Sequence, residues 1–164
     1  MPNKNKNKAL FLDRDGTLNI EKKYVFKIED FEFTEGIIAL IKTYQEKEFL
    51  IFIVSNQSGI ARGFYTENDY KILTKWMIRE LEINGIKITK VYHCPHYPEI
   101  TGECNCRKPK PGMILQAIHE FNINPSESVL IGDKKSDILA GENAGIGKNL
   151  FIQHLLEKGK NTGD

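Results

Sequence analysis

Short apolar runs that stop abruptly at a polar side chain constrain the fold of this chain more than any other feature. Three of them occupy residues 8–12, 49–54 and 128–131, and they stop at Asp13, Ser55 and Gly132–Asp133. Short continuous apolar runs are typical of strands buried on both faces of a parallel sheet. Two further strands are predicted over residues 88–92 and 149–152.

Stretches with helical periodicity separate these runs, over residues 35–48, 66–83, 111–121 and 136–143. The second begins with Thr66 in the N-cap position and Asp69 three residues later, a pattern that favours a helix start. Because strands that alternate with helices are joined by right-handed crossovers, we expect an α/β fold with a central parallel sheet covered on both faces. No repeat or long linker divides the chain, so residues 1–164 are predicted to form one domain.

The 164 residues carry a formal net charge of +1, which gives no broad attraction to nucleic acid or to anionic membranes. Residues 1–7 are rich in Lys and Asn; they could contact nucleic acid, but we interpret them as a disordered tail. No apolar run reaches the roughly 18 residues of a membrane span, and no secretory signal precedes Asp13. We therefore expect a cytoplasmic monomer that binds neither nucleic acid nor membranes.

Asp13 and Asp15 stand two residues apart in the turn after the first strand. One carboxylate could attack a phosphorus atom while the other exchanges protons with the leaving oxygen and with water. Two anions beside a phosphate would repel it, so a divalent cation is needed, and oxygen ligands favour Mg²⁺. Gly16 lets the backbone turn sharply beside a substrate.

Other strand ends and loops add groups that suit the same chemistry. They are Ser55, Asn56 and Gln57, which could hold phosphoryl oxygens; Lys108, which could neutralise developing charge; and a third carboxylate, Asp133, followed by Lys134 and, one helical turn later, Asp137. Each could instead be an ordinary turn or N-cap residue. Because the carboxyl ends of parallel strands meet at one edge of a sheet, we interpret the set as a site for phosphoryl transfer.

Three cysteines and a histidine are clustered in one short stretch, as Cys94, His96, Cys104 and Cys106. Three thiolates and one imidazole can close a tetrahedral Zn²⁺ site with no open position, which is a structural arrangement. Three clustered cysteines are unlike a secreted disulfide framework; the alternative is a set of idle thiols beside a surface histidine. We expect Zn²⁺ to order this loop and to position the two cations that follow it.

The order Asp-x-Asp-Gly-Thr, then Ser, Lys and Gly-Asp, resembles the motifs of the haloacid dehalogenase (HAD) superfamily over residues 8–152. The resemblance implies a Rossmann-like three-layer sandwich, Mg²⁺ and an aspartyl-phosphate intermediate. It implies that Asp13 is the nucleophile and Asp15 the general acid and base. Mg²⁺ would be bound by the Asp13 carboxylate, the Asp15 backbone carbonyl and the Asp133 carboxylate.

The cysteine-rich loop is similar to that of a small group in this superfamily that lacks a cap domain, the histidinol-phosphate and heptose-bisphosphate phosphatases. Too few residues separate Asp15 from Ser55, or Ser55 from Lys108, for a cap. By the same resemblance, Ser55 and Lys108 would stabilise the phosphoryl group. Asp137 would not bind the metal itself but would contact the residues around it.

The finer resemblance is to the heptose-bisphosphate phosphatases, over residues 56–67, 94–98 and 106–113. It implies hydrolysis of a sugar phosphate, the C7 phosphate of D-glycero-D-manno-heptose 1,7-bisphosphate, in the synthesis of nucleotide-activated heptose. Lipopolysaccharide is the expected destination of that sugar.

The resemblance also implies a set of substrate contacts: Tyr24 in a flap, Asn56, Gln57, Ser58, Arg107 for the second phosphate, and Lys134 for the sugar phosphate. Ser58 is small and neutral, whereas the histidinol-phosphate enzymes usually carry an acidic residue there. A neutral residue suits a sugar phosphate better than a cationic amino alcohol.

Three alternative functions are considered. One is a zinc-ordered binding module with no turnover, which the intact set of Asp13, Asp15, Lys108 and Asp133 argues against. A histidinol-phosphate phosphatase would share the catalytic groups and differ in its substrate. A phospho-accepting signalling domain also carries an Asp at a strand end, but it should lack an acid two residues later. Asp15 therefore argues against that class, because it could supply a base for rapid hydrolysis.

Overall fold

The computed structural model describes residues 6–161, of which residues 157–161 are described by their backbone alone. Within this range, five parallel strands form one sheet in the order β3-β2-β1-β4-β5. The strands are β1 (Ala9–Leu12), β2 (Leu50–Asn56), β3 (Lys90–Cys94), β4 (Val129–Gly132) and β5 (Lys148–Phe151). The predicted parallel α/β sheet is confirmed.

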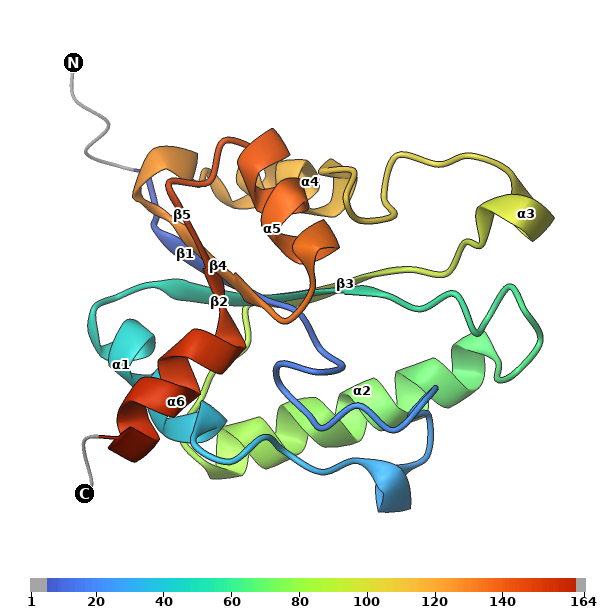
Figure 1. Cartoon of the computed structure of the whole chain (residues 1–164), viewed down its shortest axis with the longest axis horizontal. Coiled ribbons are helices and arrows are strands. Elements are labelled where there is room, and N and C mark those ends of the chain that lie inside the picture. Colours follow the sequence, from blue (N-terminus) through green and yellow to red (C-terminus); the bar gives the residue numbers. More distant parts are fainter. Residues whose placement is uncertain (1–5, 162–164) are drawn as a thin grey trace.

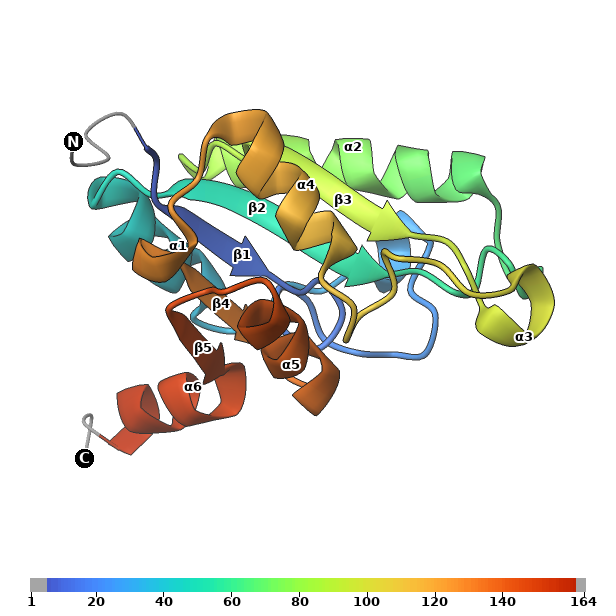
Figure 2. The same ribbon diagram turned by 90° about the horizontal axis from the view of Figure 1, so that it is seen from above.

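Helices cover both faces of this sheet (Figure 1). On one side lie α1 (Ile37–Glu46), α2 (Glu67–Ile83) and α6 (Ile152–Asn161); on the other lie α4 (Gly112–Phe121) and α5 (Lys135–Asn143). The short helix α3 (Pro98–Thr101) lies away from both layers, beyond the carboxyl end of β3 (Figures 1 and 2). Two 3-10 helices, Ile28–Asp30 and Pro125–Glu127, complete the described elements.

The core consists of two apolar clusters, one on each side of the sheet. Alternate residues of β1 point into opposite clusters: Leu10 and Leu12 pack with α1 and α2, whereas Phe11 packs with α4 and stacks on Phe52 at a ring-centroid distance of 5.3 Å. Burial on both faces explains why the strand sequences are continuously apolar.

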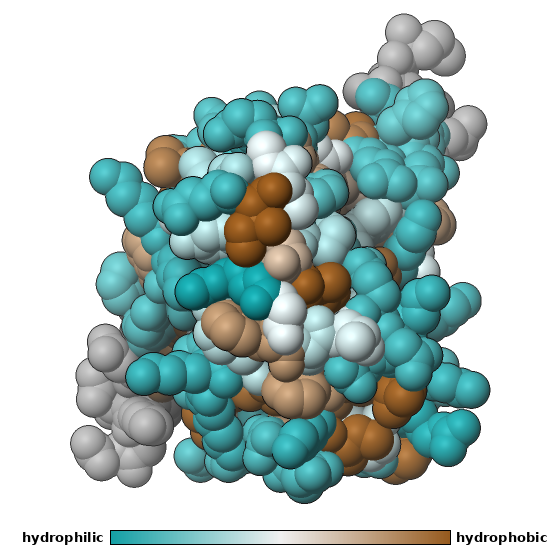
Figure 3. Space-filling model, turned by 90° about the vertical axis from the view of Figure 1, so that its right-hand side faces the viewer, coloured by the Kyte–Doolittle hydropathy of each residue, from teal (hydrophilic) through white to brown (hydrophobic). Residues whose placement is uncertain are grey.

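Strand β1 lies in the middle of the sheet, where the strand order reverses. Its neighbours are β2 on one side and β4 on the other, so Asp13 is flanked by the ends of those two strands. The crevice outside such a reversal is the usual ligand site of an open parallel sheet. Figure 3 faces the end of the molecule that carries α3, where mostly hydrophilic residues surround a few hydrophobic ones.

Two helices were not predicted from the sequence. Ile152 was expected to end the last strand, but it begins α6, whose Leu155 and Leu156 pack against the core at helical spacing. Helix α3 lies in the cysteine-rich loop, where no helix was predicted, and Pro98 occupies its first turn. A single turn with one proline has no periodicity for sequence reasoning to detect.

Residues 1–5 of the expected tail lie outside the described residues. Asn7 is ordered in the structure, because its backbone N–H donates to the Asn122 carbonyl at 2.9 Å and its own carbonyl accepts from Asn124 at 2.8 Å. Among the described helices, none is both long enough and apolar enough to cross a membrane.

Candidate active site

Lys108 is the centre of a buried ionic cluster. Its Nζ donates to Asp13 Oδ1 at 2.7 Å, to Asp137 Oδ1 at 2.6 Å and to the Val54 carbonyl at 2.8 Å. These three bonds use every proton of the ammonium group. Burial would lower the pKa of Lys108, but the carboxylates of Asp13 and Asp137 outweigh it and raise that pKa. The side chain therefore stays charged although it is buried.

Three carboxylates form an acidic cluster, Asp13, Asp133 and Asp137, whose oxygens lie within 4.8 Å of one another. Burial raises the pKa of Asp13 and of Asp133, and the nearby Asp137 charge raises both further. A cluster with only one buried ammonium beside it has an excess of negative charge. A bound cation would relieve that excess.

The hydrogen bonds of the cluster show which oxygens are free for a cation. Asp137 Oδ1 bonds to Lys108, and its Oδ2 accepts from the backbone N–H groups of Asp133 and Lys134 at 3.2 and 3.1 Å. Asp133 Oδ1, in contrast, is shielded from solvent and has no hydrogen-bond partner in the described part of the chain. An orphaned carboxylate oxygen beside the Asp13 carboxylate fits a hard cation such as Mg²⁺.

Gly16 makes room for the Asp133 carboxylate. A Cβ atom at this position would lie 2.1 Å from Asp133 Oδ2, and the backbone has φ of +94°. Both the space and the left-handed backbone therefore require glycine.

Asp15 is held quite differently from Asp13. Its two oxygens accept from Arg14 Nε and Nη2 at 3.1 Å each, from Asn19 Nδ2 at 3.0 Å and from Gln57 Nε2 at 3.0 Å. Arg14 is almost completely buried and also donates to the Val25 carbonyl at 2.7 Å. Four donors fix the orientation of this carboxylate, which still lines the pocket.

Gln57 belongs to a chain of hydrogen bonds that leads to Asp15. Its Nε2 donates to Asp15 Oδ2 and also to Ser55 Oγ at 3.2 Å, while its Oε1 accepts from the Tyr65 hydroxyl. Burial raises the pKa of Tyr65, so the hydroxyl keeps its proton and donates it. Since an ionised carboxylate only accepts, the Gln57 amide must turn its nitrogen toward Asp15 and its oxygen toward Tyr65.

The Asn56 side chain makes two hydrogen bonds to the backbone of Lys108. Its Oδ1 accepts from the Lys108 N–H at 3.0 Å, and its Nδ2 donates to the Lys108 carbonyl at 3.2 Å. The side-chain amides of Asn56 and Gln57 thus have protein partners, so their predicted contacts with substrate stay predictions.

A pocket of about 420 Å³ opens over these groups. It is lined by ten of the predicted site residues: Asp13, Asp15, Tyr24, Asn56, Gln57, Ser58, Arg107, Lys108, Lys134 and Asp137. Ser55 and Asp133 are not part of its lining; Ser55 is buried and Asp133 is half-buried. Glu21, Lys23 and Tyr65 complete the lining.

The flap over this pocket, residues 20–27, has a strained backbone. Lys23 and Tyr24 have φ of 59° and 55°, a left-handed conformation that non-glycine residues seldom adopt. The Lys23 N–H donates to Glu21 Oε1 at 2.8 Å, and the Phe26 ring stacks on Tyr65 at 5.2 Å. The stack joins the flap at Phe26 to the segment after β2, and Tyr24 forms part of the pocket wall.

The cysteine-rich loop, residues 94–106, brings its four predicted ligands together. His96 Nδ1 lies 3.5 Å from Cys94 Sγ and 3.3 Å from Cys106 Sγ, and Cys94 and Cys104 are 3.7 Å apart. Metal–ligand bonds of about 2.1–2.3 Å in a tetrahedron give ligand separations of this size. Cys94 and Cys106 are closer, at 2.6 Å, and the three cysteines are free thiols.

Backbone donors also suit a thiolate at Cys104. Although burial raises its pKa, hydrogen bonds from the backbone of Arg107 and Cys106 outweigh that effect and lower the pKa to about 6. His93, next to Cys94 in the sequence, is not part of this cluster: it bonds through Nε2 to Glu67 at 3.0 Å and stacks on Tyr70.

Sequence reasoning missed three residues that hold Asp15 directly or through Gln57: Arg14, Asn19 and Tyr65. An arginine between two aspartates at a buried strand end must itself be buried and paired, and that signal could have identified Arg14. Nothing local marks Tyr65, because its partner Gln57 reaches it only through a tertiary fold-back of residues 58–64.

Comparison with known proteins identifies the family. An HAD-hydrolase-like family model matches residues 105–151. The D-glycero-alpha-D-manno-heptose-1,7-bisphosphate 7-phosphatase of Campylobacter jejuni is 51% identical over 154 residues, which cover 94% of this chain and 87% of that protein. The chain belongs to the heptose-bisphosphate 7-phosphatase family. The D-glycero-beta-D-manno-heptose-1,7-bisphosphate 7-phosphatase of Haemophilus ducreyi is 48% identical, over 89% of this chain and 83% of that protein.

Solved structures agree with this membership. D,D-heptose 1,7-bisphosphate phosphatase from B. bronchiseptica, complexed with magnesium and phosphate, has a TM-score of 0.81 at 26% identity, over 92% of this chain and 86% of that chain. A HAD-like phosphatase from Mesorhizobium loti has a TM-score of 0.83 at 29% identity, over 88% of this chain and 71% of that one. The resemblance to the HAD superfamily and the capless fold are confirmed.

Proposed function

We propose that this member of the heptose-bisphosphate 7-phosphatase family hydrolyses the 7-phosphate of D-glycero-D-manno-heptose 1,7-bisphosphate, in the synthesis of nucleotide-activated heptose. The observation that carries the proposal is the charge around the pocket. The buried charged groups of its lining are Asp13, Lys108 and Asp137. The other cations of the lining are more exposed: Arg107 is half-buried, and Lys134 and Lys23 are exposed. This pattern suits a substrate with one phosphate at the reacting carboxylate and a second anionic group beyond it.

The donor set fits Mg²⁺, which would be held by the carboxylates of Asp13 and Asp133 and the backbone carbonyl of Asp15. When bound, the ion neutralises the acidic cluster and polarises the phosphoryl group. Asp13 attacks the phosphorus atom, and the bond between phosphorus and the sugar oxygen breaks. Lys108 balances the charge that develops on the phosphoryl oxygens, and Asp137 holds Lys108 in place.

Asp15 manages the protons in this scheme. In its protonated form it gives its proton to the sugar oxygen as that oxygen leaves. The resulting carboxylate later takes a proton from the water that attacks the phosphorus of the aspartyl-phosphate. That attack releases inorganic phosphate and restores the Asp13 carboxylate. Ser55 Oγ accepts from Gln57, which leaves its own hydroxyl proton to donate, and we propose that it bonds to a phosphoryl oxygen.

The pocket wall would select the substrate. Arg107 would hold the second phosphate, Lys134 the sugar phosphate, and Tyr24 would cover the sugar from the flap, with the neutral Ser58 beside it. Zn²⁺ held by the four loop ligands would fix the path of the chain into Arg107. We further propose a single-domain monomer in the cytoplasm, where clustered free thiols are kept reduced.

Phosphate release with Mg²⁺ present tests the substrate. Both anomers of heptose 1,7-bisphosphate should be compared with histidinol phosphate, at equal concentrations and with the Asp13→Asn variant as a blank. We expect kcat/KM for one bisphosphate anomer to exceed that for histidinol phosphate by at least about a hundredfold, because only the bisphosphate uses the outer cations. Faster turnover of histidinol phosphate would overturn the substrate and leave the chemistry in place.

A further inference from the structure

Arg62 joins three segments at the mouth of the pocket that are far apart in the sequence. It comes from the loop after β2, and its guanidinium lies over the rings of Tyr24 from the flap, Phe64 from its own loop and Tyr97 from the cysteine-rich loop. The distances from the guanidinium carbon to the ring centroids are 5.7, 4.9 and 4.8 Å respectively. Guanidinium over aromatic faces is attractive at these distances.

Two further contacts tighten this group. Arg62 Nη1 donates a hydrogen bond to the Tyr24 hydroxyl, and the Tyr24 and Phe64 rings pack at a centroid distance of 4.6 Å. The Tyr97 ring also lies 5.9 Å from the guanidinium of Arg107, which donates to the His96 carbonyl at 3.4 Å. Tyr97 therefore contacts two guanidinium groups, that of Arg62 outside the pocket lining and that of Arg107 within it.

Arg62 itself is exposed and does not line the pocket, whereas Tyr24 and Arg107 do. The flap that carries Tyr24 has a strained left-handed backbone at Lys23 and Tyr24, so outside contacts are needed to keep it in place. A capless site has no second domain to close it. Loops that hold one another are then the remaining means of closure.

We infer that Arg62 is a positioning residue, a latch that holds Tyr24 and, through Tyr97, Arg107 in the wall of the substrate pocket. The inference rests on the proposed function in so far as Arg107 and Tyr24 contact the substrate. The latch makes binding of the outer part of the substrate depend on Arg62, while the reaction at Asp13 does not.

Kinetics of Arg62→Gln test this role. With heptose 1,7-bisphosphate we expect KM to rise about tenfold, since three cation–aromatic contacts of modest size are lost. We expect kcat to stay within about twofold, and kcat/KM for p-nitrophenyl phosphate, which lacks the outer anion, to be unchanged. Arg62→Lys keeps the charge and should recover part of the affinity. The matched control is Arg79→Gln, an exposed arginine on α2.

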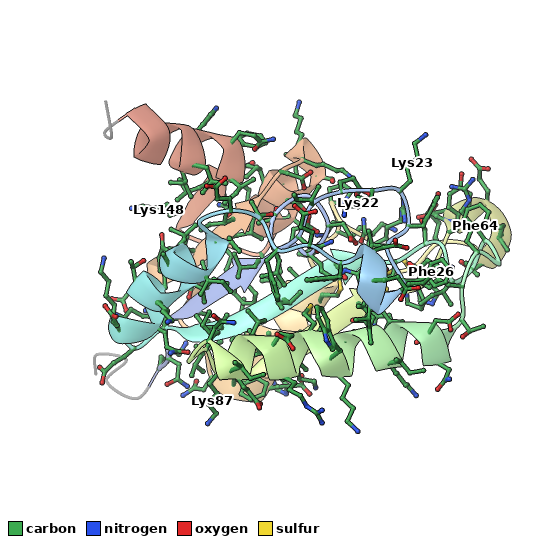
Figure 4. All side chains as sticks on the ribbon, turned by 90° about the horizontal axis from the view of Figure 1, so that it is seen from below. Lys22, Lys23, Phe26, Phe64, Lys87 and Lys148 are labelled. Atoms are coloured by element: carbon green, nitrogen blue, oxygen red, sulfur yellow. The ribbon has the colours of Figure 1, made fainter. Side chains whose placement is uncertain are left out.

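Limited digestion with trypsin tests the latch without any substrate. Figure 4 shows Lys22 and Lys23 along the flap, Phe64 at the end of the molecule that carries α3, and Lys87 at the other end. Arg62→Gln should speed cleavage after Lys22 and Lys23 several-fold and leave cleavage after Lys87 unchanged. Arg79→Gln should change neither rate.

Two results would overturn the latch. One is digestion of Arg62→Gln at the rate of the Arg79→Gln control. The other is an equal loss of kcat/KM on both substrates, which would place Arg62 in the reaction or in folding. Lack of activity on the bisphosphate would defeat the proposed function alone, because the digestion would still report on the latch. In a double-mutant cycle, Arg62→Gln and Tyr97→Ala should have less than additive effects on KM.

Discussion

Asp13 and Asp15 are separated by one residue, yet their carboxylates have different partners. Asp13 bonds to the buried Lys108 within the acidic cluster, and Asp15 is held by Arg14, Asn19 and Gln57 away from that cluster. In an extended strand residues two apart would share a face, but the chain turns tightly after Asp13, so the two side chains point to different partners. This difference suits the division of roles that we propose, with Asp13 for attack and Asp15 for proton exchange.

Replacing Asp13 by Asn should abolish turnover while the fold is kept. Asn has nearly the same shape but is a poor nucleophile, so phosphate release should fall by at least about a thousandfold. Because burial raises the pKa of Asp13, its charged form destabilises the metal-free fold at neutral pH. The melting temperature of Asp13→Asn in chelator should therefore equal or exceed that of the wild type. Retained activity would remove Asp13 from the nucleophile role.

Tyr65→Phe should lower kcat through Asp15 without touching the reacting atoms. The variant keeps the ring that stacks on Phe26 but loses the hydroxyl that fixes the Gln57 amide. The amide can then turn its oxygen toward Asp15, and Asp15 loses one fixed hydrogen bond. We therefore expect kcat to fall by about tenfold, with KM nearly unchanged.

Tyr70→Phe is the matched control for that variant. Tyr70 is also a buried tyrosine, on α2, but it lies outside the hydrogen-bond chain and stacks on His93. If both variants lose the same activity, Tyr65 only supports the fold. A change in the pH profile of kcat for Tyr65→Phe alone would show that it acts through Asp15.

Helix α2 begins where the sequence predicts, at Thr66. The Thr66 hydroxyl accepts from the Asp69 N–H at 3.0 Å, and the Asp69 carboxylate accepts from the Thr66 N–H at 2.9 Å. Thr66→Ala should therefore lower the free energy of unfolding by about 1 kcal/mol, measured by urea denaturation. Thr43→Ala on α1 is the control, because this exposed mid-helix threonine caps nothing. An equal loss in the control would contradict the capping role.

The elements that could be predicted are those whose pattern is local. Strands β1, β2 and β4 are buried on both faces, so their sequences are continuous apolar runs. Helix α2 begins with a capping box, which is a pattern within four residues, Thr66 to Asp69. Helix α6 was missed because its apolar stripe follows β5 without a turn signal between them. Strand β5 ends at Phe151, and Ile152 begins the helix. Tertiary packing, and not a local sequence preference, decides this boundary.

At the scale of the molecule, the parallel topology made much of the site predictable. Lys108 and Asp13 are 95 residues apart in the chain but bond at 2.7 Å, and their meeting follows from strands that all end at one edge. What did not follow is how loops cross that edge. The contacts of Arg62 with Tyr24 and Tyr97 depend on loop paths that no periodicity encodes.

The cysteine-rich loop should couple metal content to both stability and substrate binding. Neighbouring histidines provide a matched pair: His96 lies among the thiols, and His93 bonds to Glu67 instead. His96→Gln should reduce zinc content, lower the melting temperature by about 5 °C or more, and raise KM. His93→Gln should keep its zinc, whatever its effect on melting.

Zinc content is measured on the purified proteins, and KM with Mg²⁺ in excess so that only zinc differs. The loop leads directly from Cys106 into Arg107, whose guanidinium lines the pocket. Loss of zinc should therefore raise KM for the bisphosphate more than for p-nitrophenyl phosphate. A zinc-free protein with an unchanged melting temperature and an unchanged KM would contradict a structural role for zinc at these four residues. Equal effects on both substrates would mean that zinc supports the fold as a whole and does not position Arg107.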